Sequence, residues 1–334
     1  MTQTRFDVAG IGNAIVDVLA HADDAFIGKH GLNKGSMALV DDVRAEALYQ
    51  DMGPGIECSG GSAANTIAGL ALLGARAAFI GKVSDDQLGR VFAHDITSAG
   101  VHFATAPSKD GAPTARSMIV VTPDAERTMN TYLGACVDLN ADDVDPDVIA
   151  AAKVTYMEGY LWDKDTAKEA FVKAAKIAHE AGRMVSLSLS DPFCVDRHRD
   201  SFLALVENHV DILFANEDEI MSLYRTVTFD DALQKARGHC KIAALTRSEK
   251  GSIVVSGEEL HVVDAESVAK VMDTTGAGDA YAAGFLYGLT NGHGDDLALC
   301  ARIGGICAGD VIAQFGARPA DNLKDRLNTI LGVA

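Results

Sequence analysis

DTTGAGDAYAAGFL, residues 273–286, joins a glycine-rich turn to an apolar run of helical character. Thr274 or Thr275 can cap a helix start there, and the following residues expose successive backbone amides where the helix dipole also favours an anion. Asp279 falls in the first turn of this helix. The stretch predicts a phosphate site with an ionised carboxylate beside it; a glycine-rich turn with a dipole-stabilising Asp is the alternative.

Transfer of a phosphoryl group needs positioning, charge neutralisation and a carboxylate that accepts a hydroxyl proton. Asp279 can be that catalytic base, and Gly276, Ala277 and Gly278 can form the anion hole. The other common phosphate loop is absent, because GKH (28–30) and GKV (81–83) both fail the GxxxxGK[ST] pattern.

Composition limits the class of protein. The chain has 334 residues, 48% of them hydrophobic, and a formal net charge of −18. Such an acidic chain is not expected to bind nucleic acid or an anionic membrane, because those affinities rest on excess Lys and Arg. The six cysteines form no CxxC pair, and no HExxH occurs, so we expect reduced thiols, no zinc site and a cytoplasmic protein.

The second half of the chain alternates short apolar runs with helical stretches, which is typical of parallel βαβ units. Strands are expected at 154–161, 184–190, 210–216 and 242–248, a helix at 167–181 and a hairpin at 252–263. The pattern predicts one α/β domain over residues 1–334, with a doubly wound, mostly parallel sheet flanked by helices.

The first half also contains strands that no helix separates. They lie in 35–42, 114–124 and 126–133. We expect them to form a small β-sheet outside the main one, a lid made of about 14–20, 35–41 and 114–133.

The 273–286 stretch resembles the C-terminal signature of the ribokinase-like (PfkB) carbohydrate kinases, and GGSAAN (60–65) resembles their N-terminal signature. The resemblance implies Asp279 as the catalytic base, the three residues before it as the anion hole, and ATP with Mg²⁺ as the phosphoryl donor. K⁺ dependence stays open, because the loop at Asp273 and Thr275 resembles one that binds a monovalent cation in some members.

Candidate substrate-binding residues lie near the N-terminus. Gly60 and Gly61 allow close backbone approach to a ligand, and Asn65 can both donate to and accept from a hydroxyl. The resemblance also implies Asn13 and Asp17, with Asp17 accepting from vicinal hydroxyls; a glycine-rich turn into a core helix and an Asp that merely ends a strand are the alternatives.

The segment GIGNAI (10–15) is not a dinucleotide-binding fingerprint, since Ile15 occupies the position of its third glycine. A dehydrogenase is therefore excluded.

Three residues of the expected lid hairpin are further candidates. Arg127 is expected to swing onto the transferring phosphoryl group when the lid closes, and Met129 and Thr131 to contact the substrate. A surface arginine without a special task is the alternative.

The ATP side is expected on the later strands. The resemblance implies an NxxE element in which Asn216 and Glu219 hold Mg²⁺ largely through water, and nucleotide contacts by Asn216, Thr246, Gly251, Thr275 and Gly278.

Several stretches resemble the adenosine kinase branch: GNAIVDV (12–18), GGSAANTI (60–67), ERTMNTYL (126–133) and LSLSDPF (187–193). The expected reaction is transfer of the γ-phosphoryl of ATP to the 5′-hydroxyl of a ribonucleoside such as adenosine. A free sugar or another nucleoside as acceptor, and a non-catalytic binding protein, are the alternatives. Trp162 is expected either to stack on a purine or to pack in the core. The protein is expected to be a monomer or a homodimer that forms through the lid.

Overall fold

The computed structural model describes residues 3–124, 126–320 and 322–332. Its large sheet has nine strands in the order β14-β13-β12-β11-β10-β9-β1-β5-β6, and all neighbours are parallel except β12–β13 and β13–β14. The strands are β1 Phe6–Ile11, β5 Ala77–Ile80, β6 His102–Phe103, β9 Ala152–Glu158, β10 Met184–Ser188, β11 Ile212–Asn216, β12 Ile242–Thr246, β13 Ser252–Ser256 and β14 Glu259–Val263.

Helices cover both faces of the large sheet, because its strands are apolar on both sides. One face packs against α5 Pro146–Ala150, α6 Asp165–Glu180, α7 Pro192–His209, α8 Glu217–Tyr224 and α9 Phe229–Ala236. The other packs against α3 Ser62–Leu73, α4 Gln87–Ser98, α10 Ala277–Thr290 and α11 Leu297–Ile312, with α12 Leu323–Leu331 outside them. The doubly wound α/β fold class is confirmed.

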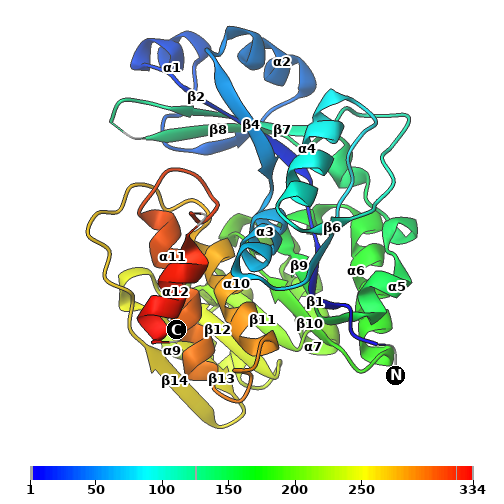
Figure 1. Cartoon of the computed structure of the whole chain (residues 1–334), viewed down its shortest axis with the longest axis vertical. Coiled ribbons are helices and arrows are strands. Elements are labelled where there is room, and N and C mark those ends of the chain that lie inside the picture. Colours follow the sequence, from blue (N-terminus) through cyan, green and yellow to red (C-terminus); the bar gives the residue numbers. More distant parts are fainter. Residues whose placement is uncertain (1–2, 125, 321, 333–334) are drawn as a thin grey trace.

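A second sheet of five strands lies at one end of the molecule, above the carboxyl ends of the large sheet (Figure 1). Its order is β3-β8-β7-β2-β4, with β2 Ile15–His21, β3 Met37–Leu39, β4 Gly55–Gly60, β7 Ala115–Val121 and β8 Arg127–Tyr132. Helices α1 Asp24–His30 and α2 Asp42–Asp51 belong to this part, and α2 and α4 pack on the outer face. We call this part the small sheet.

The chain visits the small sheet twice. It leaves the large sheet after β1, builds β2, α1, β3, α2 and β4, and returns to the body in α3. It leaves again after β6, builds β7 and β8, and returns to the body before β9. The small sheet is therefore made of two separate segments of sequence.

Some expected elements differ from the observed ones. Strand β4 was not anticipated, because GIECSG contains two glycines and a single β-branched residue; it pairs antiparallel with β2. The strand expected at 154–161 ends at Glu158 and continues as a short 3-10 helix, Gly159–Asp163.

Candidate active site

The turn before α10 has the shape that an anion hole needs. Gly276 is the N-cap, with φ of 77°, and a Cβ there would lie 2.6 Å from the backbone oxygen of Ala317, so only glycine fits. The amides of Gly276 and Gly278 have no hydrogen-bond partner among the residues that the structure describes. The Ala277 amide differs, since it donates to the carbonyl of Thr274 (3.2 Å).

Asp279 lies in the first turn of α10 and is held by two side chains of α3. Ser62 Oγ donates to its Oδ1 (2.6 Å) and Asn65 Nδ2 to its Oδ2 (3.4 Å). Burial raises the pKa of Asp279 to about 6, against the opposing effect of these two hydrogen bonds. The carboxylate is ionised at neutral pH and remains a better base than a solvated Asp.

The helix α3 brings the two glycine-rich motifs together. Gly61 is its N-cap, with φ of 102°, and a Cβ there would lie 2.1 Å from the carbonyl oxygen of Asn13. Gly60 lies against the carboxylate of Asp17, where a Cβ would be 2.4 Å from Oδ2. The structure thus brings close to Asp279 the predicted substrate-binding residues Asn13, Asp17, Gly60, Gly61 and Asn65.

Glu158, at the end of β9, is a site residue that the sequence did not reveal. Its Oε1 accepts from Asn13 Nδ2 (2.6 Å), and its Oε2 accepts from the backbone amide of Ala63 (2.7 Å) in the first turn of α3. Burial raises the pKa of Glu158 to about 7. Since Gly61 has no side chain, Glu158 supplies the acceptor for the start of α3, and it also fixes the orientation of the Asn13 amide.

Asp17 lies on the face of the small sheet that is directed toward Asp279. Burial raises the pKa of Asp17 to about 6, while Arg127 and Arg318 oppose the shift. Register pairs Asp17 with Ser117 and Ser117 with Thr131, and the two hydroxyls are 2.8 Å apart. A polar row therefore crosses this inner face.

Met129 occupies the same face two residues away from Thr131. It pairs in register with Met37 of the edge strand β3 and with Ile119 of β7. On the inner face, an apolar patch around Met129 therefore lies beside the polar row.

Arg127 begins β8 and is buried. Its guanidinium forms an ion pair with Asp273, whose carboxylate also accepts from the amides of Thr275 (2.9 Å) and Gly316 (3.3 Å). The arginine expected to act on the phosphoryl group is thus joined directly to the loop that is predicted to form the anion hole. This contact links the small sheet to the body.

Asn216 and Glu219 form a reciprocal cap at the start of α8. Asn216 Nδ2 donates to Glu219 Oε1 (2.7 Å), and the Glu219 amide donates to Asn216 Oδ1 (2.8 Å). Burial raises the pKa of Glu219 to about 7, and the nearby carboxylates of Asp191, Asp218 and Asp279 add to the shift.

A divalent cation would be favoured beside Glu219, because the neighbouring carboxylates concentrate negative charge there. Within the described ranges, however, no group of three or more His, Cys, Asp or Glu could hold a metal directly. Asn216 and Glu219 would hold an ion such as Mg²⁺ through water rather than directly.

The remaining candidates are Thr246 and Gly251, near the carboxyl end of β12, and Trp162, which follows β9. Thr246 ends β12 and pairs in register with Asn216, and Gly251 follows it in the turn to β13. Trp162 is core: it packs on Phe171 and Phe202, and its Nε1 donates to Ser201 (2.8 Å). The stacking hypothesis for Trp162 is wrong, because the ring faces α6 and α7.

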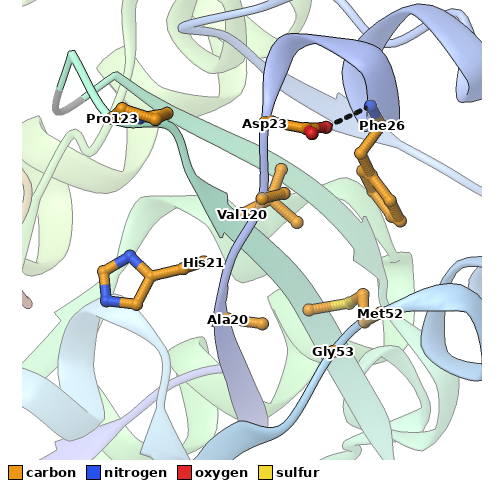
Figure 2. Close-up of a pocket in the computed structure, with 9 residues that line it drawn as sticks. Ala20, His21, Asp23, Phe26, Met52, Gly53, Val120 and Pro123 are labelled. Carbon is orange, nitrogen blue, oxygen red and sulfur yellow. Dashed lines mark hydrogen bonds between the residues drawn. The ribbon is translucent and has the colours of Figure 1, made fainter.

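A pocket of about 430 Å³ lies at the far end of the small sheet, away from this site. Figure 2 shows His21 pointing away from Phe26 and Met52, and the Asp23 side chain capping α1. None of the lining residues is a candidate catalytic group. Separately, the helices of the described chain include none with the length and apolarity to cross a membrane.

Comparisons with known proteins agree with this geometry. The model of the pfkB family carbohydrate kinases matches residues 57–324. The structure titled adenosine kinase from Sinorhizobium meliloti is 54% identical, with a TM-score of 0.90 over 98% of this chain and 100% of that one. The structure titled probable sugar kinase protein from Rhizobium etli CFN 42 is 52% identical, with a TM-score of 0.91 over 99% and 100%.

A plant relative is more distant. Probable fructokinase-6, chloroplastic, from Arabidopsis thaliana is 32% identical over 81% of this chain and 74% of its own length.

Proposed function

Because the chain belongs to the pfkB family of carbohydrate kinases, whose members are phosphotransferases with an alcohol acceptor, we propose that it transfers the γ-phosphoryl of ATP to the 5′-hydroxyl of a ribonucleoside. Adenosine is the proposed acceptor and AMP the product. The observation that carries this is Asp279 at the start of α10, held by Ser62 and Asn65 beside the amides of Gly276 and Gly278.

In this proposal Asp279 takes the proton of the attacking hydroxyl. Burial has raised its pKa to about 6, so the carboxylate is free of a proton at pH 7 yet basic enough to accept one in the transition state. Ser62 and Asn65 hold the two oxygens and thereby aim the carboxylate. The free amides at the helix start stabilise the charge that develops on the phosphoryl oxygens.

The small sheet binds the acceptor in this proposal. Asp17 accepts from the vicinal ribose hydroxyls, next to the hydroxyls of Ser117 and Thr131. Asn13 and Asn65 line the same side, and Met129 offers an apolar surface for the base. Arg127 adds positive charge over the phosphoryl group when the small sheet closes as a lid, which also excludes water.

ATP lies across the carboxyl ends of β11 and β12, near Asn216, Thr246 and Gly251, with Thr275 and Gly278 beside its phosphates. Asn216 and Glu219 would hold Mg²⁺ largely through water, and the ion would neutralise phosphate charge on the nucleotide.

The choice of adenosine rests on similarity. The 54% identity to the Sinorhizobium meliloti structure titled adenosine kinase supports a nucleoside acceptor. The second candidate is a free sugar, which the Rhizobium etli structure titled sugar kinase and the plant relative named fructokinase favour.

A phosphorylation screen decides between the two acceptors. Purified protein with ATP and Mg²⁺ is given adenosine, other nucleosides, ribose and fructose, with and without K⁺, and ADP release is measured. Adenosine should give the highest kcat/KM. A preference for ribose or fructose would refute the nucleoside proposal while keeping the kinase, and no ADP release with any acceptor would refute both.

A further inference from the structure

We propose that Arg318 is a positioning residue for the acceptor. It joins the loop 314–318, which packs against the start of α10, to the hinge between the small sheet and α3, formed by Gly60 and Gly61. The proposal rests on the proposed function and adds to it a residue outside both glycine-rich motifs. In Figure 1 the segment that carries Arg318 is the loop above α11 and α12, which rises toward the small sheet.

One end of this segment supports the start of α10. The amide of Gly316 donates to Asp273 Oδ2 (3.3 Å), and the backbone of Ala317 packs against Gly276 so closely that no side chain fits there. Gln314 Nε2 donates to the carbonyl of Arg318 (2.9 Å) and fixes the shape of the loop. The position of Arg318 is therefore set by the same backbone that shapes the anion hole.

The other end holds β4 and α4. Arg318 Nη1 donates to Asp95 Oδ2 (3.1 Å), and its Nη2 donates to Ser59 Oγ. Asp95 Oδ2 also accepts from the amide of Ser59 (2.8 Å) and from its hydroxyl (2.5 Å). A planar guanidinium can make these two contacts at once, whereas a Lys ammonium cannot reproduce the fork.

Ser59 is the last residue before the hinge. Gly60 follows it against Asp17, then Gly61 against Asn13, and then Ser62, which holds Asp279. The path from Arg318 to Asp279 is therefore short and runs through two glycines that lie tightly against Asp17 and Asn13. A shift at Ser59 would move both the Asp17 carboxylate, which is proposed to bind the acceptor, and the Ser62 hydroxyl, which orients Asp279.

Arg318 also acts through its charge. The groups that face Asp17 are Arg127 on β8, Arg318 itself, Asp279 on α10 and Cys58 on β4. The two arginines favour the ionised form of Asp17, whereas burial disfavours it. Removing Arg318 raises the pKa of Asp17, so less of this carboxylate is ionised and able to accept from two hydroxyls.

Three substitutions separate the charge of Arg318 from its contact with Ser59. Arg318→Gln removes both, and Ser59→Ala removes only the hydroxyl at the hinge. Arg318→Lys keeps the charge but cannot make both contacts. Arg90→Gln on α4 is the matched control, because Arg90 is exposed and its side chain pairs with Asp85 at the surface.

The measurements are KM of the acceptor, kcat, and the pH dependence of kcat/KM. Arg318→Gln should raise KM on the order of tenfold, with a smaller change in kcat, because it removes two charge-assisted hydrogen bonds. It should also move the acid limb of kcat/KM to higher pH. Arg318→Lys and Ser59→Ala should raise KM but leave the acid limb in place, and Arg90→Gln should match the wild type.

Wild-type KM and an unmoved acid limb in Arg318→Gln would overturn the proposal. If that variant does not fold, the other two decide: lowered thermal stability with wild-type KM in Arg318→Lys and Ser59→Ala means a structural brace only, which also overturns it. The acceptor in these assays is whichever one the wild type uses best. A wild type that prefers a sugar therefore refutes the nucleoside acceptor alone, and Arg318 is still tested.

Discussion

The two sheets of this molecule are built on opposite plans. The large sheet is covered by helices on both faces, and these helices include α10, which carries Asp279 in its first turn, and α8, which begins after β11. The small sheet is covered on its outer face, and its inner face presents Asp17, Ser117, Thr131 and Met129 toward the body. In the proposed function, the body built on the large sheet therefore carries the groups for phosphoryl transfer, and the small sheet carries the groups that bind the acceptor.

The strongest way to break this comparison is Asp279→Asn. An amide cannot accept the hydroxyl proton, so kcat should fall by at least ~10³-fold while acceptor binding stays near the wild-type value. Steady-state kinetics and calorimetry measure the two. Asp295→Asn, at an exposed Asp in the loop after α10, is the control. A kcat within a few-fold of wild type would remove Asp279 from the chemistry.

The same variant tests the pKa of Asp279. In the folded protein this pKa is raised from 3.8 to about 6, so ionisation of the buried carboxylate lowers the stability of the wild type as pH rises from about 4 to 6. Asp279→Asn should therefore melt at a higher temperature than the wild type at pH 8, and the difference should shrink toward pH 4. In the wild type, kcat should fall as pH drops below about 6. A pH-independent difference in melting temperature would contradict the shift.

Glycine substitutions at the start of α10 sharpen the role of the body. Gly276→Ala forces a side chain into the Ala317 backbone at a positive φ, so activity should fall on the order of 100-fold as the anion hole shifts. Gly28→Ala in α1 is the control, because nothing lies within 4 Å of a Cβ there and the residue is far from the site in sequence and fold. Equal losses in both variants, measured as kcat/KM, would mean that the geometry at Gly276 is not what matters.

Arginines on the two faces of the small sheet test that sheet. Arg127 lies on the inner face and pairs with Asp273, whereas Arg116 lies on the outer face and pairs with Asp42 and Glu46. Arg127→Gln should lower kcat on the order of tenfold, because it removes positive charge near the phosphoryl group. Arg116→Gln should leave kcat unchanged. A larger loss in Arg116→Gln would show that the inner face has no special part.

The smallest effect on activity is expected at Trp162. Trp162→Phe removes the hydrogen bond to Ser201 and part of the packing on Phe202, so the free energy of unfolding should fall by about 1 kcal/mol. Denaturant unfolding measures this change. KM for adenosine should stay as in the wild type, and a clear rise would return the ring to the substrate site.

The sequence alone predicted the parts whose signals are local. The turn before Asp279 and the alternation of strands and helices after Lys153 depend on residues close together in the chain, so pattern and spacing reveal them. Glu158, Ser62 and Arg318 were not assigned roles, because their partners lie far away in sequence. In the sequence Glu158 is an ordinary strand residue, and its role becomes visible only through its contacts with Asn13 and the start of α3.

The double excursion of the chain into the small sheet has a consequence for how such a protein can diversify. Two separate segments interleave to make that sheet, so recombination cannot exchange it as a module without cutting the chain at four junctions. New acceptor preferences are reached more simply by point substitutions on the inner face. For the protein engineer, a library confined to β2, β7 and β8 should explore substrate range, whereas grafting the whole sheet from a relative should fail at the joins.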